Sequence, residues 1–216
     1  MIRLILLRHG NTFEDHQTPT QIGARTDLPL TEKGKMQAEQ MAHFLKTQGI
    51  VPSAIYRGPL KRQAQTAQIL GQHFQIADQI VPTLNEIDYG PWEGLTSEEI
   101  RQKWPQPYDS WTTRSVWPHS IFASPLPLEG IKQWLAHLQK THPSETILAV
   151  SSNGLIRFFY AFQKEKWDLL AQQSEMEKIK VKTGHFCEVH LTANGIEIHS
   201  WNQNPSLEKT GPVLAL

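Results

Sequence analysis

An arginine and a histidine follow the first strong strand signal of the chain. The apolar run Ile2–Leu7 predicts a strand that is buried on both faces, and it ends at Arg8, His9 and Gly10. In open α/β sheets the chemistry lies just beyond the carboxyl ends of the strands. A guanidinium can hold the oxygens of a phosphoryl group while an imidazole attacks its phosphorus. The tripeptide therefore predicts a phosphoryl-transfer site; a strand end with two solvated polar residues is the alternative.

Two further arginines are candidates for contacts with the same anion. Arg62 falls in the first turn of a helix that we predict to begin at Pro59. Backbone N–H groups already favour an anion there, so a positive side chain opposes the helix dipole unless a ligand or a carboxylate faces it. Arg25 lies in an irregular polar loop at residues 14–29. It is either a second-tier phosphate contact or an ordinary exposed arginine.

Three carboxylates compete for the role of proton donor. Glu86, Asp88 and Glu93 lie in a loop, residues 84–94, whose Gly and Pro residues predict an ordered turn structure. Each of them could protonate a leaving group, and each could equally be a solvated acid. The residue pattern alone does not rank them.

A second apolar strand leads to the same edge of the predicted sheet. The run Thr146–Val150 continues into Ser152, Asn153 and Gly154, and helical spacing resumes after it. Two buried parallel strands would bring this turn next to the one that carries His9. Asn153 is then a neutral hydrogen-bond donor for the anion.

Periodicity predicts the other elements of an α/β fold. A helix is expected from an N-cap at Thr31 to near Gly49, with Met36 on its buried face. Short strands are expected at residues 54–56 and 79–81, and another helix at residues 129–142.

Residues 96–128 predict a covering segment. A short helix is expected from Thr96 to Trp104, after which dense prolines argue against a regular element and dense aromatics argue against disorder. We expect an ordered aromatic lid over the crevice; the alternative is an excursion that touches no ligand. Its aromatic residues favour an apolar or aromatic leaving group unless they belong to the core: Trp104, Tyr108, Trp111, Trp117 and Phe122.

A hairpin is expected near the end of the sequence. Asn194-Gly195 between two alternating runs is a strong hairpin signal, and counting outward from it places His190 opposite His199. Two facing histidines could chelate a metal, but no third ligand is assured and a solvated strand face is favoured.

Composition limits the class of protein. The 216 residues suit one domain, residues 1–216, and 21 basic residues balance 21 acidic ones, so no basic field suggests a nucleic acid or an anionic membrane as partner. A single cysteine, Cys187, excludes an internal disulfide and a thiolate metal cluster. Without a signal peptide or membrane-spanning run, a cytoplasmic protein is expected.

These segments together resemble the histidine phosphatase superfamily, with its phosphoglycerate mutase-like fold, over nearly the whole chain. Four stretches in this order carry the resemblance: Leu7–Thr12, Asp27–Gly34, Gly58–Arg62 and Glu86–Gly94. It implies a three-layer α/β/α sandwich on a mostly parallel central sheet, with a helical or irregular insertion over the active site. Together with the hairpin signal, this is the fold that we expect.

The resemblance also assigns roles. His9 would be the nucleophile that forms a phosphohistidine, Arg8 and Arg62 would hold the phosphoryl oxygens, and Glu86 would be the proton donor. Further phosphate or substrate contacts are expected from Asn11, Thr12, Arg25, Asn153 and Gly154. It implies no metal and no cofactor, and a small-molecule phosphate ester as the partner. The sequence does not set the oligomeric state.

The chain departs from the family pattern at two places. Asn153 stands where a second histidine is usual before Gly154, and Leu128–Ile131 stands where the family often has Gly-Glu-Ser. A neutral donor in place of a charged one would slow the reaction roughly tenfold to a few hundredfold, so Asn153→His is expected to speed turnover. A phosphomonoesterase is favoured over a mutase, because the loop Phe13–Gln17 lacks the usual mutase context. A phosphate-binding protein whose catalysis has decayed is the remaining alternative.

Overall fold

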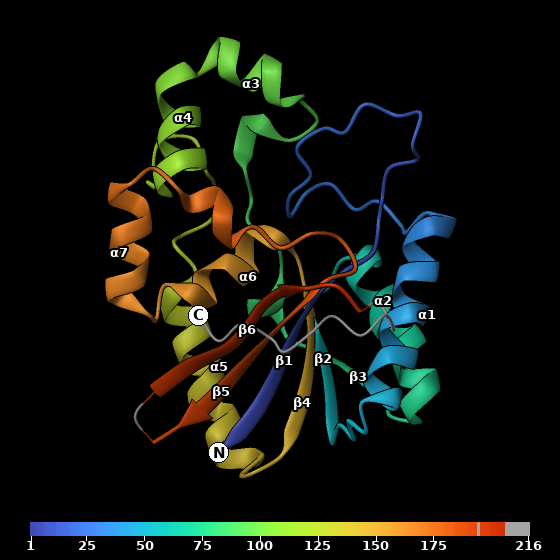
Figure 1. Ribbon diagram of the computed structural model, residues 1–216. Helices are drawn as coiled ribbons and strands as arrows, with labels where there is room; N and C mark the ends of the chain where they lie inside the picture. Colours follow the sequence, from blue (N-terminus) through green and yellow to red (C-terminus); the bar gives the residue numbers. More distant parts are fainter. Residues whose placement is uncertain (194, 206–216) are drawn as a thin grey trace.

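A sheet of six strands forms the centre of the structure, a computed structural model that describes residues 1–193 and 195–205 (Figure 1). The strands lie in the order β3-β2-β4-β1-β5-β6. Their bounds are Ile2–Arg8 (β1), Ala54–Arg57 (β2), Asp78–Ile80 (β3), Thr146–Ser151 (β4), Phe186–Thr192 (β5) and Gly195–Gln203 (β6). The first four strands pair in parallel, whereas β5 is antiparallel to β1 and β6 to β5. The predicted mostly parallel sheet is confirmed.

Helices cover both faces of this sheet. On one face lie α1 (Glu32–Thr47) and α2 (Lys61–Phe74), and on the other α5 (Leu128–Thr141) and α6 (Asn153–Tyr160) (Figure 1). Successive side chains of β1 point to opposite faces. Leu7 therefore packs in the cluster of α1 and α2, while Leu6 packs in the cluster of α5 and α6. This is the expected three-layer α/β/α sandwich.

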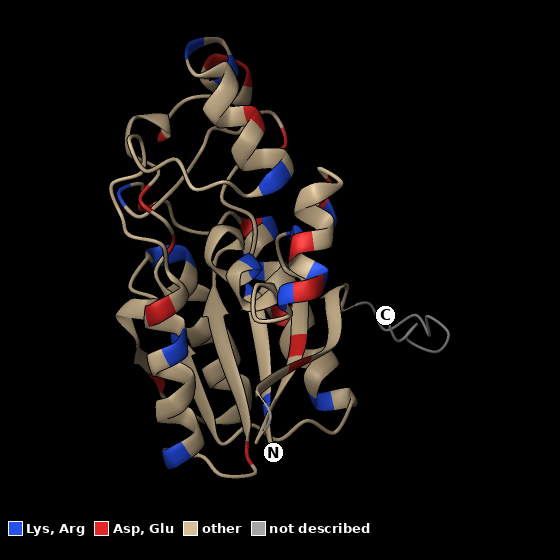
Figure 2. Ribbon diagram, turned by 90° about the vertical axis from the view of Figure 1, so that its left-hand side faces the viewer, with Lys and Arg blue, Asp and Glu red and all other residues tan. Residues whose placement is uncertain are grey.

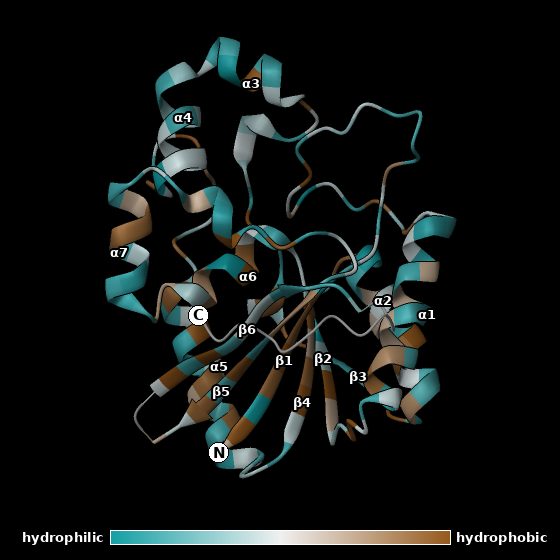
Figure 3. Ribbon diagram, in the orientation of Figure 1, coloured by the Kyte–Doolittle hydropathy of each residue, from teal (hydrophilic) through white to brown (hydrophobic). Residues whose placement is uncertain are grey.

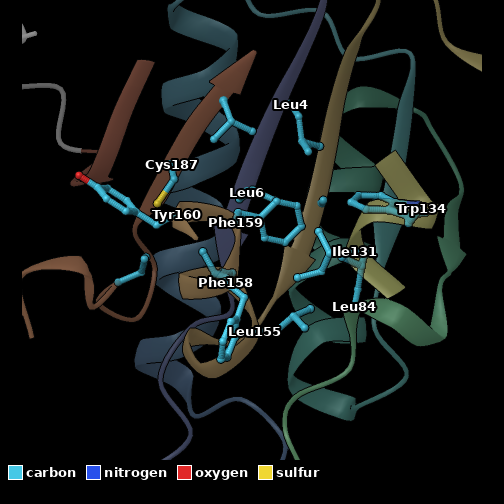
Figure 4. Packing of buried hydrophobic residues seen from close by; sticks show 14 of the residues in the cluster. Leu4, Leu6, Leu84, Ile131, Trp134, Leu155, Phe158, Phe159, Tyr160 and Cys187 are labelled. Atoms are coloured by element: carbon cyan, nitrogen blue, oxygen red, sulfur yellow. The ribbon is translucent and has the colours of Figure 1, made fainter. Parts of the chain in front are cut away.

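Hydropathy follows the layers. The strands are mostly apolar, and polar residues lie on the helices around them (Figure 3). Figure 4 shows Leu6 beside Phe159 and Ile131, in the layer between the sheet and the helices. In Figure 2, basic and acidic residues are interspersed along the helices. The ends of β1 and β4 are thus fixed by a buried apolar layer, at roughly 25 cal/mol for each Å² removed from water.

Local signals set the helix starts. Thr31 caps α1, since its side chain accepts a hydrogen bond from Gly34 N at 3.1 Å, as predicted. Helix α2 begins at Lys61, two residues later than expected, but Arg62 stays in its first turn. Met36 is 58% exposed, so its expected place on the buried face of α1 is wrong.

The insertion is more regular than the sequence suggested. After the short turns η1 (Pro82–Leu84) and η2 (Gly90–Trp92), α3 (Ser97–Lys103) and α4 (Pro105–Arg114) rise above the carboxyl end of β1 (Figure 1). Dense prolines did not prevent α4, because Pro105 and Pro107 fall in its first turn, where backbone N–H groups have no partner within the helix. The remainder of the insertion, residues 115–127, is irregular.

The chain then returns to the sheet. Helix α7 (Lys164–Gln172) and the turn η3 (Met176–Ile179) precede the β5–β6 hairpin, which is present as expected. Its register differs by two residues, since Thr192 pairs with Gly195 and His190 with Glu197. The predicted turn residue Asn194 lies outside the described residues. His190 and His199 still stack, with ring centroids 4.9 Å apart.

The described parts of the chain show neither a cluster of metal ligands nor a membrane-spanning helix. Within residues 1–193 and 195–205, no group of three His, Cys, Asp or Glu side chains is placed to hold a metal ion. In the same residues, no helix has the length and apolar character needed to cross a bilayer.

Candidate active site

His9 lies in the first position after β1, with 2% of its surface exposed. Its Nδ1 is 2.7 Å from Gly10 O. A carbonyl can only accept, so Nδ1 carries the proton and the lone pair belongs to Nε2. Burial, with the charges of Arg8 and Arg62, holds the pKa of His9 well below its ordinary value. The imidazole is therefore neutral at neutral pH and has a nitrogen free to attack.

The charges of Arg8 and Arg62 lower the pKa values of His9 and Glu86. Arg8 donates from Nη1 to Val181 O at 2.6 Å. Arg62 is fully buried and donates from Nη1 to Thr26 O at 2.6 Å and from Nη2 to Gly23 O at 3.1 Å. In both, Nε is buried without a hydrogen-bond partner. Such orphaned donors of a cation suit an anion supplied by a ligand.

Glu86 is held by main-chain groups. Its Oε2 accepts from Gly154 N at 3.1 Å, and its Oε1 accepts from Leu155 N at 3.1 Å and from Ile87 N at 2.9 Å. Burial raises the pKa of this carboxyl, against the opposing effects of the Ile87 hydrogen bond and the Arg62 charge. Glu86, with a raised pKa, and His9, with a lowered one, line the same cavity, which is the pairing that general acid catalysis with a nucleophile requires.

The other two acids of this loop lie elsewhere. Asp88 pairs with Arg25, Oδ1 to Nε, at 3.0 Å. Glu93 accepts hydrogen bonds from Thr26 Oγ1 at 2.6 Å and from the backbone N–H of Arg25 at 3.2 Å. The geometry thus separates the three carboxylates that the residue pattern left unranked.

Arg25 does not join the cluster. It is exposed, it pairs with Asp88, and it does not line the cavity beside His9. The expectation of a phosphate contact is corrected here, because its partners Asp88 and Glu93 hold its side chain on the outer surface of the loop.

A cavity of about 730 Å³ opens above His9. Asn11, Thr12 and Asn153 line it, and their role as substrate contacts stays a prediction. Gly154 instead directs its N–H to Glu86. All five lid aromatics belong to the apolar cluster or pack against it, and two of them, Tyr108 and Trp111, also line the cavity.

Comparisons with known proteins show to which family the chain belongs. The sequence profile of the histidine phosphatase superfamily (branch 1) matches residues 4–204.

The chain belongs to the histidine phosphatase superfamily.

Similar proteins include phosphatases and phosphoglycerate mutases. Phosphoserine phosphatase 1 of Hydrogenobacter thermophilus is 30% identical over 166 residues, 74% of this chain and 75% of the relative. A 2,3-bisphosphoglycerate-dependent phosphoglycerate mutase of Bartonella henselae is 28% identical over 166 residues, 71% of this chain and 77% of the relative. The solved structure of a mycobacterial glucosyl-3-phosphoglycerate phosphatase superposes with a TM-score of 0.78 at 24% identity, covering 93% of this chain and 98% of that one. The predicted family, fold and enzyme class, a histidine phosphatase, are confirmed.

The end of strand β4 in this histidine phosphatase brings Asn153, and not Ser152, to the cavity. Arg8 pairs with Ser151, and His9 N donates to Ser151 O at 3.1 Å. Ser152 follows as a buried residue, and its Oγ accepts from Gln63 Nε2 at 3.1 Å. Asn153 begins α6 and lines the cavity, and its Oδ1 accepts from Val181 N at 2.8 Å. That Asn153 stands in place of the second histidine of the family stays a prediction.

Several groups of this site escaped the sequence reasoning. The carbonyl of Gly10 that orients His9 has no sequence signal. Arg157 lines the cavity with 7% of its surface exposed, and its signal was available: it is the lone charge in the run of buried residues 154–160 of α6. Tyr89 and Trp92 also line the cavity from the loop of Glu86.

Gly154 is required by close packing. A Cβ there would lie 2.1 Å from Tyr89 Oη and 2.4 Å from Glu86 Oε1. We expect Gly154→Ala to displace the carboxyl, lower kcat roughly 100-fold and reduce the free energy of unfolding by about 1–3 kcal/mol. Steady-state kinetics and urea unfolding measure both. Gly130→Ala in α5 is the matched control, since its Cβ would make an ordinary 3.4 Å contact; equal behaviour of the two variants would contradict the argument.

Proposed function

We propose that this protein is a phosphomonoesterase that passes the phosphoryl group of a small ester first to His9 and then to water. The observation that carries the proposal is the buried pair of His9 and Glu86, whose pKa values are shifted in opposite directions beside two arginines with orphaned Nε groups. A nucleophile, a proton donor and the Arg8 cation line one cavity, and the charge of the buried Arg62 acts on both His9 and Glu86, which matches the needs of phosphoryl transfer. The roles assigned to Arg8, Arg62, Asn11 and Thr12 belong to the same proposal.

In the first step the lone pair of His9 Nε2 attacks phosphorus. The bond from phosphorus to the ester oxygen breaks, and Glu86 gives its proton to that oxygen, which leaves as an alcohol. Arg8 and Arg62 offset the charge on the phosphoryl oxygens. The products of this step are a phosphohistidine and a Glu86 carboxylate.

In the second step Glu86 acts as a base. It takes a proton from a water molecule whose oxygen attacks phosphorus, and the bond from phosphorus to Nε2 breaks. Inorganic phosphate leaves, and His9 and Glu86 return to their starting protonation states. The sum is hydrolysis of the ester.

The direct test is release of inorganic phosphate from a panel of phosphate monoesters, together with trapping of the phosphorylated protein by an alkaline quench. We expect turnover and base-stable label on His9. A protein that releases no phosphate from any ester and takes up no label would overturn the proposal and favour a phosphate-binding protein.

A mutase is the second candidate, favoured by the similarity to phosphoglycerate mutases. It would return the phosphoryl group of His9 to a second hydroxyl instead of water. Interconversion of 2- and 3-phosphoglycerate faster than phosphate release would establish it. A cytoplasmic location is proposed with either activity, on the ground of the single buried thiol of Cys187.

Asn153 suggests how to speed the reaction. It lines the cavity, where a protonated imidazole would offer the phosphoryl group a charged donor in place of a neutral one. We expect Asn153→His to raise kcat about tenfold. The unfolding temperature is measured alongside, because the variant loses the side-chain oxygen that accepts from Val181 N at 2.8 Å. Ser152→His is the control, since Ser152 is buried away from the cavity lining and its Oγ accepts from Gln63 Nε2 at 3.1 Å; a larger gain from that variant would contradict the argument.

A further inference from the structure

Three arginines of the described chain share an unusual state: a buried Nε with no hydrogen-bond partner. They are Arg8, Arg62 and Arg157. Buried donors of a charged group are costly when unpaired, and folded proteins nearly always satisfy them. For Arg8 and Arg62 the proposed phosphoryl group supplies the partner. Arg157 shows the same deficit but is not part of that arrangement.

Arg157 lines the same cavity as Arg8 and His9. Its guanidinium carbon lies 4.6 Å from the ring centroid of Trp111, and Nη2 donates to Ser115 Oγ. Both contacts come from the lid and both are neutral. Within residues 1–193 and 195–205, no carboxylate lies within ion-pair distance of Arg157. Glu177, an acid on the same cavity wall, is exposed and pairs with Lys180 at 3.5 Å.

The place of Arg157 on α6 tells which part of a substrate it would meet. It follows Gly154 by three residues, close to one helical turn, or about 4.5 Å of rise. Gly154 N binds Glu86, the proposed donor to the leaving oxygen. Arg157 therefore lies on the side of the alcohol, beyond the bond that breaks, and not beside the phosphoryl group.

We infer that Arg157, held by Trp111 and Ser115, binds a second acidic group on the alcohol part of the substrate. The inference rests on the proposed phosphomonoesterase function and deepens it: the preferred substrates are phosphate monoesters that also carry a carboxylate or a second phosphate. The planar fork of a guanidinium matches either oxyanion with two parallel hydrogen bonds, and the Trp111 ring fixes the plane of the fork.

Matched pairs of esters test this. The pair 3-phosphoglycerate and glycerol 3-phosphate differs by a carboxylate, and the pair fructose 1,6-bisphosphate and fructose 6-phosphate differs by a phosphate. We expect kcat/KM to favour the more acidic member of one pair by at least about tenfold, mainly through KM. The pair that responds identifies the second acid as carboxylate or phosphate.

Arg157→Met removes the charge and keeps an apolar chain against Trp111. We expect it to lower the kcat/KM ratio within the responding pair about 10–100-fold, while Arg157→Lys restores part of it as a charge without the fork. Arg114→Met is the control, since Arg114 is an exposed lid arginine outside the cavity. Circular dichroism and the unfolding temperature show that each variant folds.

Several results would overturn the inference. They are no preference in either pair, an equal loss for both members in Arg157→Met, or the same change in Arg114→Met. Hydrolysis of p-nitrophenyl phosphate separates this from the larger proposal. If that ester is cleaved and the pairs are not discriminated, only the role of Arg157 fails; if neither it nor any ester of the panel is cleaved, the phosphomonoesterase function fails.

Discussion

Replacing His9 with alanine is expected to lower kcat by at least about 10⁴-fold, because the variant has no nucleophile to accept the phosphoryl group. The buried ring contributes a lone pair at Nε2 that no neighbour replaces in that geometry. Phosphate release from the best ester of the panel measures the loss. Quenching wild-type protein during turnover should give a base-stable, acid-labile phosphoryl label, and His9→Ala should give none.

The control for this experiment is His137→Ala, which removes an exposed histidine from the outer side of α5. It should keep wild-type kcat and wild-type labelling. Persistent label in His9→Ala, or a loss of activity smaller than about tenfold, would mean that another residue carries the phosphoryl group.

Replacing Glu86 with glutamine is expected to lower kcat about 10²–10⁴-fold for alkyl phosphates. The amide side chain would keep an acceptor for the backbone N–H groups but would carry no acidic proton to give. The loss should be much smaller for p-nitrophenyl phosphate, whose leaving group needs little protonation. Comparing the two ester types in one variant separates loss of a proton donor from general damage to the site.

The same pair predicts the pH profile of kcat/KM. Activity should fall as pH rises through the raised pKa of Glu86, because the carboxyl loses its proton, and should fall at low pH as His9 becomes protonated at its lowered pKa. Glu86→Gln should abolish the alkaline limb and leave the acid limb in place.

Asp88→Asn is the matched control for Glu86. The residue pattern left both acids open, but Asp88 pairs with Arg25, and asparagine keeps the oxygen that accepts from Gly90 N at 2.9 Å. Its kcat and its alkaline limb should be those of wild type. If the alkaline limb moved in Asp88→Asn and persisted in Glu86→Gln, the proton donor would be Asp88 and not Glu86.

Sequence patterns were informative wherever the structure repeats a simple period. The apolar runs of β1 and β4 and the Thr31 cap of α1 follow from alternation, burial and a single side-chain acceptor. The register between strands was harder to predict, because it depends on backbone pairing between separate segments. The β5–β6 hairpin shows this, since His190 pairs with Glu197 and not with His199.

Other features could not be foreseen because they arise only from tertiary contact. The rank of Glu86 over Asp88 depends on which backbone N–H groups face each carboxyl. Arg157, in contrast, had a signal in the sequence as the lone charge in the buried run of its helix, but a buried charge is an exception to the usual pattern and was passed over. Helix α4 shows a third limit: proline counts argued against it, but proline position within the first turn allowed it.

The hydrogen bonds that hold Glu86 have an evolutionary consequence. Its carboxyl is gripped by main-chain amides at the start of α6, and amides are present whatever side chains surround them. Helices α3 and α4 contribute residues to the wall of the cavity. Substitutions in these helices can therefore leave the reactive chemistry unchanged. Reactivity and selectivity can then diverge separately, and grafting a foreign lid between residues 96 and 127 should yield a chimera that cleaves different esters by unchanged chemistry.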